Sequence, residues 1–149
     1  MKKLVLEYWT PLLAWLILIF FFSTDTFSSG QTSRIIGPIL MFFFPGLSPQ
    51  EIEVWHGVIR KFAHIAAYFV LAVFAYRSLK YDQPDLVRAK VQTITFVLLT
   101  AILDEFHQRL TVSRGASIVD VGYDCLGAVW ALWIITSYES RRLRTYSVL

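Results

Sequence analysis

Apolar stretches separated by short polar segments divide the sequence into four candidate membrane-spanning helices, at approximately residues 4–22, 62–79, 91–108 and 118–136. Each stretch is close to the roughly 20 residues that a helix needs to cross a bilayer. A further apolar run, residues 35–44, is too short to span the membrane. The pattern therefore predicts an all-α integral membrane protein. We expect a single domain over residues 1–149, a four-transmembrane-helix bundle with a short re-entrant or interfacial segment between helices one and two.

Short polar motifs mark the expected helix boundaries. Ser48, Pro49 and Glu51 form a capping box, and the helix that follows begins with an amphipathic part that suits the membrane interface. Residues 81–85 break this helix, and Ser117 with Asp120 resembles a second capping box. The first helix is expected to remain uncleaved, because residues 28–30 offer a poor signal-peptidase site.

Composition supports lipid as the surrounding solvent. Hydrophobic residues make up 56% of the chain and charged residues 17%, against about 25% charged in a typical soluble domain. The net charge of +3 comes from short basic runs between apolar stretches, which indicate membrane topology and not a nucleic-acid surface. The single cysteine, Cys125, excludes an intramolecular disulfide, and no zinc-binding spacing occurs. Membrane lipid is the expected partner, with no cofactor and no metal.

The distribution of basic residues predicts the topology. With four spans, the following nine lie on the side of the termini: Lys2, Lys3, Arg77, Lys80, Arg88, Lys90, Arg141, Arg142 and Arg144. Five lie on the other side: Arg34, Arg60, Lys61, Arg109 and Arg114. Basic residues favour the cytoplasmic side, so both termini are expected in the cytoplasm.

This topology brings distant polar residues to the outer end of the bundle. The predicted ligand-binding set is Arg60, Lys61, His64, Tyr68, Glu105, Gln108, Arg114, Asp120 and Asp124. The candidate catalytic residues are His64, Asp104, Glu105 and Asp124. Ionisable groups within a membrane cost a few kcal/mol each and usually face a partner or a wet cavity. The cytoplasmic half of the bundle carries no comparable set.

Each of these residues also has a purely structural interpretation. His64 either binds a ligand or shuttles a proton, or it is a buried histidine hydrogen-bonded across the bundle. Asp104 or Glu105 is expected to pair with Arg60 or Arg114 across helices. Asp120 suits helix capping, an explanation that Asp124 lacks. Gly127 is expected to permit close helix packing.

Together these spacings resemble a known family. The pattern is Arg60-Lys61, His64 and Tyr68 on one helix, followed by Asp104-Glu105, Gln108, Arg114, Asp120, Asp124 and Gly127. It resembles the VanZ-like family of bacterial membrane proteins over roughly residues 23–127, with one departure, since that family commonly has Asn where this chain has Asp124. The resemblance implies a small multi-pass protein of the bacterial cytoplasmic membrane, within the cell envelope. The family's namesake is linked to resistance to the glycopeptide antibiotic teicoplanin.

Four functions compete at this stage. The first is an envelope factor that binds a lipid-linked or cell-wall ligand at the outer leaflet, and the second is an enzyme acting on such a ligand. A proton-coupled transporter is disfavoured, because four helices without a repeat and an inner half without charges offer no transport path. A purely structural polar cluster is the fourth. The sequence leaves a homo-oligomer open.

Overall fold

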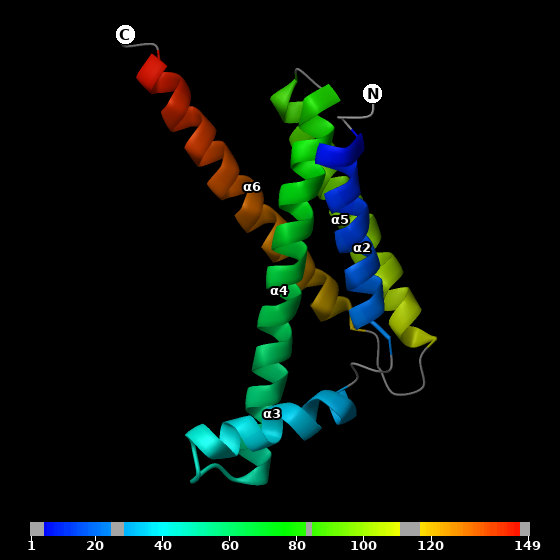
Figure 1. Ribbon diagram of the computed structural model, residues 1–149, viewed down its shortest axis with the longest axis vertical. Helices are drawn as coiled ribbons and strands as arrows, with labels where there is room; N and C mark the ends of the chain where they lie inside the picture. The colour runs from blue at the N-terminus through cyan, green and yellow to red at the C-terminus, as the bar shows by residue number, and fades with distance from the viewer. Residues whose placement is uncertain (1–4, 25–28, 83–84, 111–116, 147–149) are drawn as a thin grey trace.

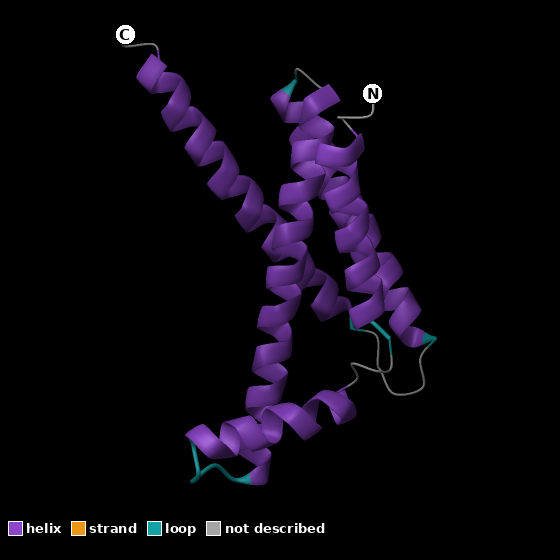
Figure 2. Ribbon diagram, viewed as in Figure 1, coloured by secondary structure: helices purple, strands orange, loops and turns teal. Residues whose placement is uncertain are grey.

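The computed structural model describes residues 5–24, 29–82, 85–110 and 117–146, and its regular structure within these ranges is entirely helical (Figures 1 and 2). The elements are η1 (Val5–Trp9), α2 (Thr10–Phe22), α3 (Ser29–Phe43), α4 (Pro49–Asp82), α5 (Leu86–Arg109) and α6 (Ile118–Tyr146). The predicted all-α membrane fold is confirmed. Helices α4, α5 and α6 each contain a stretch long and apolar enough to cross a membrane, and residues 6–22 form a shorter apolar helix.

The helix starts follow from local chemistry. The Ser48 backbone N–H donates to Glu51 Oε2 at 2.8 Å, and the Glu51 N–H donates to Ser48 Oγ at 3.3 Å, so the predicted capping box begins α4. Asp85 caps α5, because its Oδ1 accepts from the backbone N–H groups of Val87 and Arg88. The predicted break between the second and third long helices is thereby confirmed.

Helix α3 lies across the start of α4 (Figure 1). Its 15 residues would extend only about 22 Å, which is less than the hydrocarbon thickness of a bilayer. From Ile35 to its end, α3 exposes large apolar side chains, among them Ile35, Ile39, Phe42 and Phe43. A short helix crossing a long one, with an exposed apolar half, is typical of a segment in the membrane interface.

The core is built mainly from α4 with α5 and α6. Where these helices meet, alanines such as Ala72, Ala75 and Ala131 are completely buried, so the backbones approach closely. The closest approach is at Gly127 on α6, where an added Cβ would lie 2.3 Å from the Ile65 carbonyl oxygen on α4. The expected role of Gly127 in close helix packing is confirmed.

Outside this core, large apolar side chains point away from the protein. Leu103 and Phe106 on α5 and Trp130 and Trp133 on α6 are all more than half exposed. Such a surface is stable in contact with lipid tails and not with water. The chain is therefore a multi-pass membrane protein whose helices contact lipid. Helices α4 and α6 run in the same direction, away from α3 (Figure 1).

Candidate functional site

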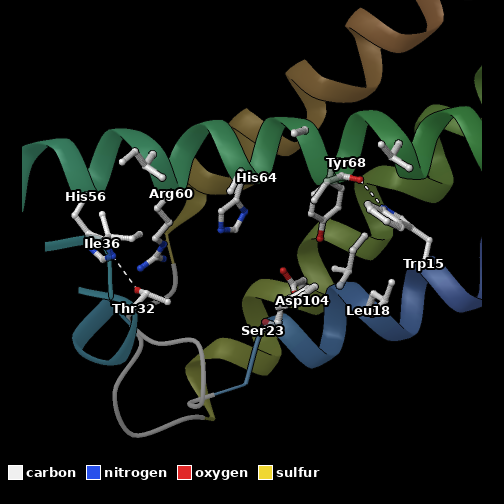
Figure 3. Close-up of a pocket in the computed structure, with 17 residues that line it drawn as sticks. Trp15, Leu18, Ser23, Thr32, Ile36, His56, Arg60, His64, Tyr68 and Asp104 are labelled. Carbon is white, nitrogen blue, oxygen red and sulfur yellow. Dashed lines mark hydrogen bonds between the residues drawn. The ribbon is translucent and has the colours of Figure 1, made fainter. Parts of the chain in front are cut away.

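Four polar side chains follow one another at four-residue intervals along α4: His56, Arg60, His64 and Tyr68. Residues four apart share a helix face, so the row covers about 18 Å of α4. All four side chains line a cavity of about 530 Å³ between α2, α3, α4 and α5 (Figure 3). Sequence reasoning identified the last three residues of this row.

Two residues of this row, Arg60 and His64, contact acidic residues on α6. Arg60 Nη2 lies 3.3 Å from Asp120 Oδ2, and His64 Nδ1 lies 3.0 Å from Asp124 Oδ1. The four-residue spacing on α4 matches that on α6 because the helices run in the same direction. Asp104 or Glu105 was predicted to pair with Arg60 or Arg114; the ion pair formed by Arg60 is with Asp120, and Arg114 lies outside the described residues, so a pairing with Arg114 stays a prediction. The close approach at Gly127 brings α6 near enough for its own acids to reach α4.

Asp104 approaches the cavity from α5. Its Oδ2 accepts a hydrogen bond from Gln108 Nε2 at 3.2 Å, one helical turn away. Its other oxygen, Oδ1, is buried without a hydrogen-bond partner among the described residues, as is the Tyr68 hydroxyl. In Figure 3 the Tyr68 hydroxyl points toward Asp104. This part of the cavity thus presents a buried carboxylate and a hydroxyl that face each other and retain hydrogen-bonding capacity.

Glu105 contacts the start of α6. Its Oε2 accepts a hydrogen bond of 2.6 Å from the backbone N–H of Ser117, at the start of α6. In the predicted capping box that acceptor would have been Asp120, which instead pairs with Arg60. The Ser117 side chain does take a capping role, accepting from the Val119 N–H at 3.2 Å. Glu105 and Ser117 therefore join the ends of α5 and α6.

Lys61 and His107 do not line the cavity. Lys61 is exposed, and its Nζ lies 5.3 Å above the Tyr123 ring centre in a cation–π contact. His107 packs against Phe20 with ring centres 6.1 Å apart. Arg114 falls outside the described residues.

Apart from Ser23 at the end of α2 and Thr32 of α3, the remaining wall of the cavity is apolar. It is formed by Leu18 and Phe22 of α2 and by Ala63 and Ala66 of α4. Trp15 fixes α2 against α4, since its indole N–H donates to the Ala67 carbonyl oxygen at 2.8 Å. The cavity therefore combines a hydrocarbon-like side with a polar side.

Sequence reasoning missed the contribution of α3 to this site. His56 Nε2 and Thr32 Oγ1 are hydrogen-bonded at 2.8 Å, which attaches α3 to α4 beside the cavity (Figure 3). Both residues line the cavity. The available signal was the spacing, because His56 precedes Arg60 by one helical turn on the same face.

A second polar group was also missed, toward the end of α6. Glu139 accepts a hydrogen bond from the Tyr76 hydroxyl at 3.1 Å and forms an ion pair with Lys80. This group joins the last turns of α4 to α6, away from the cavity, so the half of the bundle opposite α3 is not free of charged residues. Among the described residues, no three His, Cys, Asp or Glu side chains converge in a way suited to a metal ion.

The fold and site define a class: a multi-pass helical membrane protein with a cavity that is apolar on one side and carries an Arg, a His–Asp pair and a buried acid on the other. The chain belongs to the VanZ/LLP1 family, whose sequence model matches residues 8–139. The predicted VanZ-like membership is confirmed. No curated protein and no solved structure matches the chain.

Proposed function

We propose that this protein binds a lipid-linked or cell-wall ligand through the cavity beside α4, with the site facing the outside of the cell. The observation that carries the proposal is the mixed character of the cavity. Leu18, Phe22 and Ala66 offer an apolar wall to a hydrocarbon chain, and Arg60 with His64 offers a polar end to a headgroup. Ligand sites are typically apolar clefts with a few placed polar groups.

Arg60 suits an anionic headgroup. A guanidinium is planar and always charged, and it binds phosphate or carboxylate through paired N–H groups. The contact with Asp120 holds the side chain in place beside the cavity. A preorganised arginine loses less conformational entropy when it binds an anion.

The proposed orientation of the protein in the membrane is inferred from the distribution of its basic residues. Of the 11 Lys and Arg residues within the described ranges, seven lie toward the end of the molecule opposite α3 and four toward the α3 end, which favours a cytoplasmic location for both termini. The first residue of η1 and the last of α6 lie at the same end of the molecule, opposite α3, as this topology requires (Figure 1). The cavity then faces the outer leaflet of the cytoplasmic membrane, where envelope ligands occur.

Glycopeptide resistance is the proposed physiological outcome. The test is expression of the wild type and of the Arg60→Gln and His64→Ala variants in a teicoplanin-susceptible bacterium, with equal membrane abundance verified. Glu139→Gln is the matched control, because it changes a charged group away from the cavity. We expect protection by the wild type and the control only. A wild type that gives no protection would refute the resistance role.

An enzyme acting on the same ligand is the second candidate, and the His64–Asp124 contact favours it. A histidine whose Nδ1 is held by a buried carboxylate is oriented to use its other nitrogen as a base. Here Asp124 is completely buried and His64 lines the cavity. Incubation of the protein with envelope lipids, followed by mass spectrometry, tests for turnover. Products made by the wild type but not by His64→Ala would support the enzyme, whereas binding without products would support the first function.

A further inference from the structure

Three buried oxygen atoms of residues that line the cavity make no hydrogen bond of normal length among the described residues: the Ser23 hydroxyl, the Tyr68 hydroxyl and Asp104 Oδ1. Asp104 is 2% exposed and Tyr68 is 1% exposed, and although the Tyr68 hydroxyl faces Asp104, neither it nor Asp104 Oδ1 makes a hydrogen bond of normal length among the described residues. Both residues line the cavity (Figure 3). Buried polar groups in native proteins are nearly always hydrogen-bonded, and a carboxylate oxygen without a donor is especially costly. Asp104 and Tyr68 therefore retain hydrogen-bonding capacity for a group that a ligand would supply.

The chemistry of that group follows from the Asp104 and Tyr68 oxygens. An ionised carboxylate only accepts hydrogen bonds, and a tyrosine hydroxyl accepts as well as donates. A primary ammonium group carries three N–H donors and a positive charge, so it can donate to both oxygens and offset the charge of Asp104. A ligand that carried only negative charge would instead be repelled by this acid.

The same cavity also carries a cation. Arg60 lies two helical turns from Tyr68 along α4, on the same face and about 12 Å away in helix rise. On the polar side of the cavity, the Arg60 guanidinium lies nearer α3, and the Tyr68 hydroxyl and the Asp104 carboxylate lie farther from α3 (Figure 3). His64 lies between them. A headgroup with a phosphate and an ammonium matches both ends, and the apolar wall of α2 and α4 matches an acyl chain.

We infer that the cavity binds a phospholipid whose headgroup carries a primary ammonium beside its phosphate. The phosphate contacts Arg60, the ammonium donates to Asp104 and Tyr68, and the acyl chain lies against Leu18 and Ala66. This inference rests on the proposed lipid-binding function and specifies its ligand class. In this arrangement Asp104 determines which lipid headgroup is preferred, and Arg60 contributes binding affinity for the phosphate of any phospholipid.

The test is native mass spectrometry of the purified full chain after exchange into an equimolar mixture of dioleoyl phosphatidylethanolamine, phosphatidylglycerol and phosphatidylcholine. Phosphatidylcholine keeps the positive charge but has no N–H donor. The wild type should retain phosphatidylethanolamine about tenfold over the other two, the size expected for hydrogen bonds to a charged group. Asp104→Asn should lose this preference and still retain lipid, whereas Glu139→Gln should behave as the wild type.

A second pair of variants tests whether the lipid binds in this cavity. Ala66→Phe narrows the cavity at an exposed position of its wall and should reduce retention of all three lipids. Ala14→Phe, at another exposed alanine, which lies on α2 and does not line the cavity, should leave the retention of all three lipids unchanged. Equal retention of the three lipids by the wild type would overturn the headgroup inference while leaving lipid binding intact. A wild type that retains no lipid would overturn both.

Discussion

His64 and Asp124 form a direct link between α4 and α6, with Nδ1 and Oδ1 3.0 Å apart. Asp124 is completely buried, and the His64 side chain is 14% exposed, through the cavity that it lines. One contact therefore serves two purposes. It joins the two most extensively packed helices of the bundle, and it holds an imidazole at the edge of the candidate site.

The energetic coupling of this pair can be measured. His64→Ala and Asp124→Ala should each lower the free energy of unfolding by about 3 kcal/mol, since each leaves a buried polar partner behind. The double variant should cost clearly less than the sum, because nothing is then left unpaired. Tryptophan fluorescence during denaturation by SDS measures these values in detergent. Strict additivity would show that the contact does not stabilise the fold. Asp124→Asn should cost less than Asp124→Ala, because an amide oxygen still accepts from His64.

Gly127 provides a steric prediction. A Cβ at this position would lie 2.3 Å from the Ile65 carbonyl oxygen and 3.0 Å from the Phe69 nitrogen, both backbone atoms of α4. Gly127→Ala must push the two helices apart and should cost about 1–3 kcal/mol of stability. Gly122→Ala, on the same helix with no atom within 4 Å, is the matched control and should be neutral or stabilising. Thermal unfolding in the same detergent compares the two, and equal effects would contradict the close contact.

The sequence predicted the components of the site better than their pairing. Periodicity and spacing placed Arg60 and His64 on one face of a helix and Asp120 and Asp124 on one face of another. The partner of Arg60 could not be predicted, because it depends on the direction and spacing of α4 and α6. That spacing is set by one close approach, at Gly127, whose importance is visible only when the Ile65 carbonyl lies against it.

The cavity itself was beyond prediction from sequence. Its apolar wall includes Leu18 and Ala66, which resemble any lipid-facing residues in a hydropathy pattern. The contribution of α3 was hidden for a similar reason, since Thr32 lies in an ordinary polar segment and meets His56 only because α3 crosses α4. Long-range contacts of this kind leave little trace in local sequence.

Glu105 should stabilise the start of α6. Its carboxylate accepts from the Ser117 N–H at 2.6 Å, at the helix end where negative charge is favourable. Glu105→Ala should cost about 1–2 kcal/mol, as the loss of a helix cap does, and should speed hydrogen exchange at the Ser117 amide. Glu105→Gln keeps an acceptor oxygen and should have a smaller effect. Glu53→Ala, at an exposed position of α4, serves as the control. Unchanged exchange at Ser117 in Glu105→Ala would rule out the cap.

The orientation of the chain decides which leaflet the candidate site can serve. Two single-cysteine variants test it, both built on Cys125→Ala. Gly46→Cys lies in the exposed turn between α3 and α4, with no atom within 4 Å of its Cβ. Val87→Cys lies in the first turn of α5 at the opposite end, where the native side chain is 68% exposed. The excess of basic residues at the α5 start and the two termini favours that side for the cytoplasm.

An impermeant maleimide added to intact cells should therefore label Gly46→Cys and leave Val87→Cys unmodified. Both should react after the cells are permeabilised, which controls for accessibility of each thiol. The reverse pattern in intact cells would place Arg60, His64 and the cavity on the cytoplasmic side. Binding of an outer-leaflet ligand would then be excluded, although the cavity chemistry and its preference for an ammonium headgroup would still apply to a lipid of the inner leaflet.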